Sequence, residues 1–363
     1  SVLDLPETPD LAVIVIPYMH VPGALKECGE RGIKAVVIIS AGFRESGVEG
    51  VEREREVIQI AKEYDIRVIG PNVLGVIDTY TPMNVTFAAG TPPQGNIAFM
   101  SQSGALQTAI LDWSLASRDL GFSKFVSLGN KADVSEIDLM RAWADDPESK
   151  VILAYIEGVP NGQEFIRVAR EVSRKKPILV LKSGVTESGS RAVSSHTGSL
   201  AGSEQAYDAA FYQAGVLRMN SLQELFDSAR AFANQPLLDG DRIAIVTNAG
   251  GPGILATDTL ERRGMQLARL EHETIQKLDE FLPDAASAAN PVDVLGDAHG
   301  DRYAQALELI AQDPNVDGLM CIVTPQAMTE IVETANAIGK LSQRTDKPVF
   351  GVFMGEERIK AVS

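Results

Sequence analysis

The chain has 363 residues, of which 45% are hydrophobic, and its formal net charge is −16. This length predicts two or three domains, each with its own core, and the negative charge argues against non-specific binding of nucleic acid. No run of roughly eighteen apolar residues and no basic N-terminus before an apolar segment occurs, so neither a membrane span nor a signal peptide is predicted. Two distant cysteines, Cys28 and Cys321, argue against a disulfide framework, and no metal-ligand spacing of Cys and His is present. We therefore expect a cytoplasmic protein without a metal site.

Strands and helices alternate from the N-terminus, which predicts a doubly wound parallel sheet of the α/β class. In the first part of the chain, the predicted strands are 11–16, 35–39 and 67–69, and the predicted helices are 22–31 and 48–64. The proline-containing stretch 79–94 is predicted to cross to the next domain. A first domain is therefore expected at 1–80.

The alternation continues through two more predicted domains, 94–236 and 240–363, with a linker at 234–240. The predicted strands are 97–100, 124–127, 151–156, 178–181 and 216–218 in the second domain, and 243–246, 318–323 and 348–353 in the third. The whole chain is thus predicted to contain tandem doubly wound sheets.

Two strand-to-helix turns, far apart in the sequence, share one design of small residues and hydroxyls or amides. Glycine permits close approach of an anion, and the first N–H groups of the helix supply donors and partial positive charge. Many α/β proteins end a strand in this way, so either turn alone is a weak signal. The candidate phosphate-binding residues are Ser101, Ser103, Gly104 and Ala105 in the first turn and Asn248, Gly250 and Gly251 in the second.

Between these turns lies His196, in a run of small residues and hydroxyls from Ser194 to Gly202. A large anionic group can approach this imidazole and the backbone around Thr197 and Gly198. A neutral ring nitrogen is a nucleophile for phosphate, so the run predicts a phosphorylated histidine held between two helix N-termini. The alternative is a turn histidine whose neighbours only cap the next helix.

These motifs, together with the segments 70–75 and 289–293, resemble the acyl-CoA synthetases that form nucleoside diphosphates, a family that includes the succinyl-CoA synthetase α subunit. The resemblance covers nearly the whole chain. It implies a partial Rossmann-like CoA-binding domain followed by two flavodoxin-like domains. One departure is Val73, where many relatives carry cysteine.

The resemblance also implies roles for individual residues. His196 would be the phosphorylated residue, and Glu157 the carboxylate that orients it; locally, Glu157 also fits a solvated acid at a strand end. Segment 129–133 would lie near the active site or be only a helix start capped by Asp133. Lys182 could place a cation near phosphate, although lysine at a strand end is more often solvated. The residues expected beside CoA are Ser40, Gly42, Phe43 and Asn72; the alternative for the segment from Ser40 to Phe43 is a plain strand-to-helix turn.

The implied reaction converts acyl-CoA, phosphate and ADP into a carboxylic acid, CoA and ATP, through an acyl phosphate and a phosphohistidine. Members of the family use an ATP-grasp module that binds ADP or ATP with Mg²⁺, and nothing in this sequence resembles one. The usual glycine-rich turn for the CoA pyrophosphate is also missing. We therefore expect a fragment, or a subunit of an oligomer that acts with an ATP-grasp partner.

The alternatives are a regulatory CoA-binding protein, a protein acetyltransferase relative without ligase activity, or a scaffold that only docks its partner. Relatives without ligase activity often lack the histidine, which this chain keeps.

Overall fold

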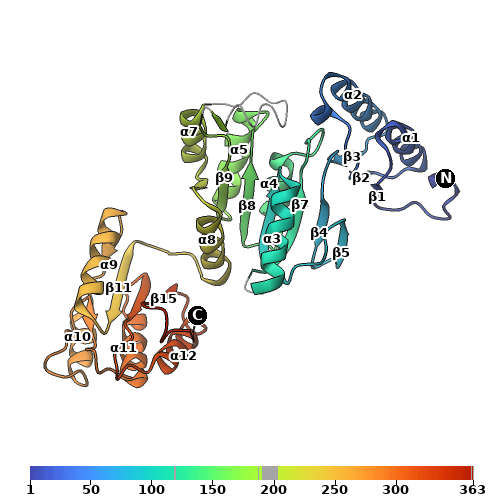
Figure 1. Cartoon of the computed structure of the whole chain (residues 1–363). Helices are drawn as coiled ribbons and strands as arrows, with labels where there is room; N and C mark the ends of the chain where they lie inside the picture. The colour runs from blue at the N-terminus through green and yellow to red at the C-terminus, as the bar shows by residue number, and fades with distance from the viewer. Residues whose placement is uncertain (118–119, 187, 190–202, 361, 363) are drawn as a thin grey trace. The chain divides into compact units, whose positions relative to one another are not determined.

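The computed structural model describes residues 1–117, 120–186, 188–189, 203–360 and 362. They form two compact units, residues 1–233 and 234–363 (Figure 1). Among the described residues, no helix combines the length and the apolar character needed to cross a membrane.

The first unit begins with a small parallel sheet in the order β1-β2-β3, as the strand–helix alternation predicts. Its strands are β1 (Ala12–Ile14), β2 (Ala35–Ile38) and β3 (Arg67–Ile69), and its helices are α1 (Val21–Arg31) and α2 (Val48–Glu63). Helix α1 ends at Gly32, whose φ of 87° lies in the left-handed region that glycine adopts without strain. Apolar side chains from both helices and all three strands pack into one core.

The larger sheet of the first unit has seven strands in the order β10-β9-β8-β6-β7-β4-β5. Strands β6 to β10 run parallel, and β4 is antiparallel to both β5 and β7. The strands are β4 (Gly75–Asp78), β5 (Met83–Thr86), β6 (Gln94–Ser101), β7 (Phe122–Ser127), β8 (Val151–Ile156), β9 (Ile178–Lys182) and β10 (Leu217–Met219).

The prediction that 79–94 only crosses between domains is wrong, because this stretch contains β5. The side chain of Asp78 accepts hydrogen bonds from the backbone N–H groups of Tyr80 and Thr81, at 2.9 and 3.0 Å, and so closes a hairpin. Strand β4 then adds to β7, with Val76 opposite Val126. Residues 75–78, inside the first predicted domain, are thus part of the second sheet.

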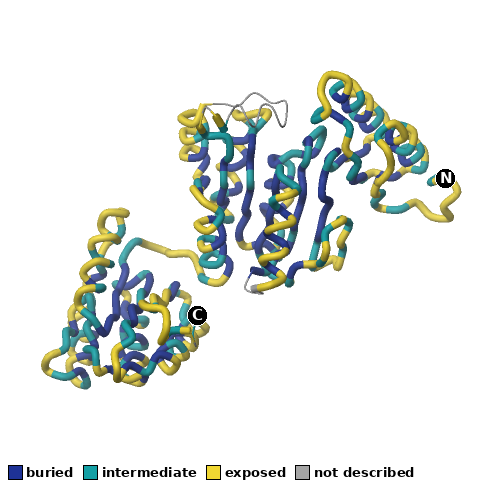
Figure 2. Tube along the Cα trace, in the orientation of Figure 1, coloured by how far each residue is buried: buried dark blue, intermediate teal, exposed yellow. Residues whose placement is uncertain are grey.

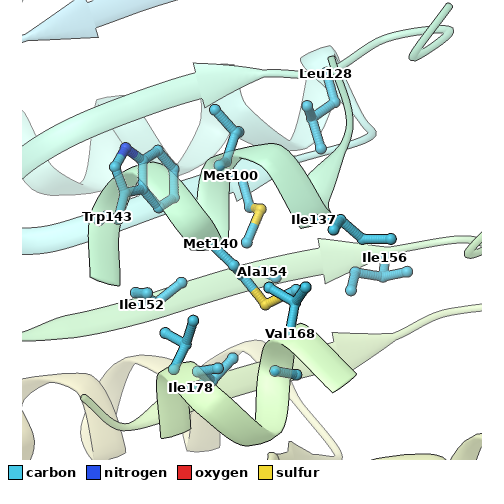
Figure 3. Close-up of a cluster of buried hydrophobic side chains, with 14 of the residues drawn as sticks. Met100, Leu128, Ile137, Met140, Trp143, Ile152, Ala154, Ile156, Val168 and Ile178 are labelled. Carbon is cyan, nitrogen blue, oxygen red and sulfur yellow. The ribbon is translucent and has the colours of Figure 1, made fainter. Parts of the chain in front are cut away.

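Helices cover both faces of the larger sheet, which confirms a doubly wound fold. Alternate residues of β6 face opposite sides: Ala98 and Met100 pack with α4, α5 and α7, whereas Ile97 and Phe99 pack with α3 and α8. The helices are α3 (Gly104–Ser117), α4 (Glu136–Ala144), α5 (Gly162–Ser173), α7 (Glu204–Ala214) and α8 (Leu222–Asn234). Figure 3 shows Met140 and Trp143 of α4 against the side chains of β8. The central strands are consequently buried on both faces, as Figure 2 shows.

The second unit has one parallel sheet in the order β12-β11-β14-β15, and β13 pairs with the end of β11. Its strands are β11 (Arg242–Thr247), β12 (Gln266–Leu267), β13 (Val292–Asp293), β14 (Gly318–Val323) and β15 (Val349–Phe353). Its helices are α9 (Gly250–Arg262), α10 (His272–Asp279), α11 (Gly300–Gln312) and α12 (Ile331–Ser342). Strands β12 and β13 were not predicted, because two residues are too few to show the alternation of apolar and polar side chains that marks a strand.

Candidate functional site

The parallel strands β6 to β9 place four polar segments at one edge of the larger sheet, at their carboxyl ends. Gln102 follows β6, Lys131 lies in the loop after β7, Glu157 follows β8, and Lys182 ends β9. Ligands of open α/β sheets bind at this edge. The side chain of Gln102 joins two of the segments: its Oε1 accepts hydrogen bonds from the N–H groups of Glu157 and Gly158, at 2.9 and 3.2 Å.

The turn between β6 and α3 holds its shape through one hydroxyl. Ser101 Oγ donates to the carbonyl of Ser103 and accepts from its N–H, both at 3.0 Å. Ser103 Oγ in turn accepts from the N–H of Leu106 at 3.3 Å and so caps α3. Within the described residues, the N–H groups of Gly104 and Ala105 have no protein acceptor, so both remain open to an anion.

The second turn, between β11 and α9, repeats these hydrogen bonds. Thr247 Oγ1 donates to the carbonyl of Ala249 at 3.0 Å and accepts from its N–H at 3.1 Å. Asn248 takes the place of Gln102, and its Oδ1 accepts from the N–H and the hydroxyl of Thr324, after β14. The two turns therefore share a hydrogen-bonding design, as well as the residue types that the sequence shows.

The side chain of Asn248 is fully engaged inside the protein. It is 2% exposed, and its Nδ2 donates to Thr324 O at 2.9 Å and to Thr329 Oγ1 at 3.1 Å. Any contact from this turn to phosphate is thus left to the backbone of Gly250 and Gly251. A Cβ on Gly251 would meet no atom within 4 Å, so the packing of the unit does not itself require glycine there.

We expect Asn248→Ala to lower the free energy of unfolding of the second unit by about 1–3 kcal/mol, because it removes a buried side chain that hydrogen-bonds to Thr324 and to the buried Thr329. Denaturant unfolding, with hydrogen exchange of the β14 amides, measures this effect. The matched control Asn336→Ala alters an exposed residue of α12 and should change stability by less than about 0.5 kcal/mol. Equal effects of the two variants would contradict the structural role of Asn248.

Glu157 is 7% exposed, so a solvated acid at a strand end does not describe it. Lys131 and Lys182 both interact electrostatically with it. Lys131 Nζ donates to the carbonyl of Gly158 at 2.6 Å and lies 3.2 Å from an oxygen of Glu136, which is fully buried. The carboxylate is therefore buried, and the charges of two nearby lysines attract it without an ion pair to either.

Burial is the main cause of the pKa shifts of both lysines. It lowers the pKa of Lys182 to about 8; the charge of Arg218 lowers it further, and that of Glu157 opposes the shift. Burial also lowers the pKa of Lys131, against the attraction of Glu136. The expectation that Lys182 is solvated is wrong, since this residue is 5% exposed. Local sequence does not distinguish a buried lysine from a solvated one at the end of an apolar strand.

The loop after β7, which carries Lys131, is held by contacts with α2 and with the turn that precedes it. Asn130 Nδ2 donates to Glu45 at 2.6 Å and to Glu54 at 2.8 Å, and the guanidinium of Arg44 donates to the Asn130 carbonyl. The alternative prediction that Asp133 caps the following helix is wrong. Asp133 accepts from the Val68 N–H at 2.8 Å, whereas Ser135 caps α4 in a capping box with Asp138.

The residues expected beside CoA lie around the carboxyl ends of β1, β2 and β3. Ser40 Oγ accepts from the Ile16 N–H at 3.1 Å, and the Ser40 carbonyl accepts from the Asn72 N–H at 3.0 Å, which brings these two residues together. Gly42 has a φ of 107°, and a Cβ there would approach the Tyr18 ring to 2.5 Å. The ring of Phe43 is fully buried in the core, its N–H donates to Glu45 at 3.0 Å, and its carbonyl accepts from the Ser46 N–H at 2.7 Å.

His196, Thr197 and Gly198 lie outside the described residues. The chain enters this segment after β9 and leaves it at Ser203, whose Oγ accepts from the Ala206 N–H at 3.3 Å and caps α7. Within the described chain, no group of three or more His, Cys, Asp or Glu side chains forms a candidate metal site.

Comparison with known proteins places these features in a family. Three family models match: a CoA binding domain over residues 1–79, a succinyl-CoA ligase like flavodoxin domain over 94–232 and a ligase-CoA domain over 243–362. The α subunit of acetate–CoA ligase [ADP-forming] II from Pyrococcus furiosus is 48% identical, over 98% of this chain and 78% of its own length. The chain belongs to the ADP-forming acyl-CoA synthetase family.

Other relatives of this family differ in length. Acetate–CoA ligase [ADP-forming] I from Archaeoglobus fulgidus is 46% identical over 99% of this chain, which spans about half (51%) of that protein. A solved structure of dinucleotide forming acetyl-coenzyme A synthetase 1 from Ca. Korarchaeum cryptofilum, in complex with phosphate and ADP, superposes with a TM-score of 0.92 at 38% identity. The superposition covers 99% of this chain and 78% of that one.

Proposed function

We propose that this chain is the part of an ADP-forming acyl-CoA synthetase that binds the CoA thioester and carries the phosphorylated histidine. The reaction converts acyl-CoA, phosphate and ADP into the carboxylic acid, CoA and ATP. The observation that carries the proposal is the buried Glu157, which interacts electrostatically with Lys131 and Lys182, at the sheet edge where Gly104 and Ala105 leave open N–H donors. Membership of the family supports the same reaction.

In this proposal His196 accepts the phosphoryl group. Phosphate attacks the acyl carbon of the thioester and CoA leaves as the thiol; a ring nitrogen of His196 then attacks phosphorus, and the carboxylate leaves. ADP removes the phosphoryl group from His196 in the last step and restores the free imidazole.

Glu157 orients the imidazole in our proposal. A carboxylate that accepts the proton on one ring nitrogen fixes the tautomer, so that the other nitrogen holds its lone pair for phosphorus. Gln102 accepts hydrogen bonds from the N–H groups of Glu157 and Gly158, so the backbone that carries the carboxylate is held in place. The turn around Gly104 and Ala105, and that around Gly250 and Gly251, would bind phosphoryl oxygens through backbone N–H groups.

We assign CoA binding to the carboxyl edge of the first small sheet, around Ser40, Gly42, Phe43 and Asn72. The three predicted domains, 1–80, 94–236 and 240–363, would then be a CoA module and two flavodoxin-like modules. The ranges of the matching family models support this division. Nucleotide with Mg²⁺ would bind on an ATP-grasp module supplied by a partner subunit or by another part of a longer polypeptide.

A requirement for that module tests the proposal. The 363-residue chain, given acyl-CoA, phosphate and ADP, should form ATP only when an ATP-grasp partner is added. A coupled assay of ATP formation, with and without the partner, measures this. Steady ATP formation by the chain alone would overturn the assignment of nucleotide binding to a separate module.

A further inference from the structure

A buried ammonium group that forms no ion pair with any described residue lies at the carboxyl end of β9. Lys182 is 5% exposed, and in the part of the chain that the structure describes no carboxylate lies within ion-pair distance of its Nζ. Burial of an unpaired charge is costly, so such groups in proteins are usually paired or serve a ligand.

The contacts that hold Lys182 leave part of its donor capacity unused. Its Nζ donates to the carbonyl of Ser183 and lies 4.4 Å from the centre of the Tyr207 ring. An ammonium group has three N–H donors, and among the described residues only one of them meets a protein oxygen. The Tyr207 hydroxyl accepts from the Val159 N–H at 3.1 Å, so the ring beneath the ammonium is tied to the loop after β8.

Lys182 also lies on the strand next to the one that leads into Glu157, the carboxylate of the proposed reaction. Its backbone pairs with Ile156 in the sheet, one residue before Glu157. The charged and titratable groups that surround it are Glu157 after β8, Lys131 after β7, Arg218 on β10 and Tyr207 on α7. Arg218 is already paired with Glu204 and Asp208, which leaves Lys182 as a cation available at this point.

We propose that Lys182 is a binding residue for the oxyanion of phosphate and of the transferred phosphoryl group. Its unused N–H donors would bind phosphate oxygens, and its charge would offset the repulsion between a phosphoryl group and Glu157. This inference rests on the proposed function for the identity of the anion. The binding of phosphate to Lys182 can nevertheless be measured without turnover.

The first test uses inorganic phosphate and the NMR titration of the Lys182 amine, in the full chain with its ATP-grasp partner. An anion beside an ammonium group favours its charged form, so phosphate should raise the pKa of Lys182 from about 8 by about 1 unit or more. Glu157→Gln removes an attractive charge and should lower the pKa measured without phosphate. An ordinary lysine pKa that phosphate leaves unchanged would overturn the proposal.

The second test compares Lys182→Met with Lys175→Met. Methionine keeps the length and apolar stem of lysine, so Lys182→Met should fold. Calorimetry should show phosphate binding at least about 10-fold weaker in Lys182→Met, since hydrogen bonds to charged groups are strong. Lys175 is 51% exposed and pairs with Asp145, and its variant should bind phosphate as the wild type does. Equal binding in the two variants would contradict the proposal.

The outcomes separate this inference from the proposed function. If phosphate shifts the Lys182 titration but His196 never becomes labelled, the anion site stands and the phosphohistidine assignment fails. If His196 is labelled equally fast in wild type and Lys182→Met, the reaction stands and the role of Lys182 fails. If Lys182→Met does not fold, the titration of Lys182 in the wild-type chain still shows whether phosphate binds beside it.

Discussion

His196→Ala is expected to abolish phosphorylation of the chain. In the proposed reaction the ring nitrogen of His196 is the only nucleophile that takes the phosphoryl group, and alanine offers none. The complete enzyme, with its ATP-grasp part, is incubated with labelled ATP and Mg²⁺, and the acid-labile label is mapped by mass spectrometry. In the wild type the label should lie on His196 alone.

The matched control for this experiment is His272→Ala, which alters an exposed histidine at the start of α10 in the second unit. This variant should retain the full label. Label that persists in His196→Ala would remove the central residue of the proposed function. The other three histidines, His20, His272 and His299, would then be examined in turn.

Glu157→Gln is expected to slow phosphoryl transfer to His196 by roughly 10²-fold or more, as loss of a positioned acid–base partner does. Glutamine keeps the shape of the side chain and leaves the backbone bonds to Gln102 in place. It removes the negative charge that would stabilise a protonated imidazole. Rapid-quench measurement of label on His196 gives the rate.

Glu171→Gln provides the control, because Glu171 is 63% exposed and pairs with Arg167 on the surface of α5. An isolated exposed charge contributes little to stability or to a distant reaction, so His196 in this variant should be phosphorylated at the wild-type rate. Thermal unfolding of both variants should stay close to that of the wild type, which separates a chemical effect from misfolding. Wild-type kinetics in Glu157→Gln would leave His196 without an identified partner.

Much of the fold follows from local sequence patterns. The strands at 151–156 and 318–323 have the predicted boundaries, because each is a continuous apolar run that is buried on both faces. The helices predicted from residues 22 and 48 lie within one residue of those bounds at each end. The hairpin of β4 and β5 was missed because its strands are short and its stability depends on pairing with β7, far along the chain.

The two strand-to-helix turns show what the sequence predicted of the site. Their repeated small and hydroxyl residues indicated a shared design, and the structure shows the same pair of hydrogen bonds at Ser101 and at Thr247. The phosphate contacts assigned to these turns remain predictions.

By itself, the sequence determined the alternation of strands and helices and the family to which the chain belongs, and it predicts the histidine that would take the phosphoryl group. Only the tertiary structure decided which strand-end residues are buried together. The burial of Glu157 and Lys182 depends on β8 and β9 being neighbours and on α7 covering their ends with Tyr207. Local sequence predicts a backbone conformation, but the environment of a charge depends on every element packed around it. For that reason local sequence favoured two solvated side chains, where the fold holds a buried carboxylate and a buried ammonium group that forms no ion pair with any described residue.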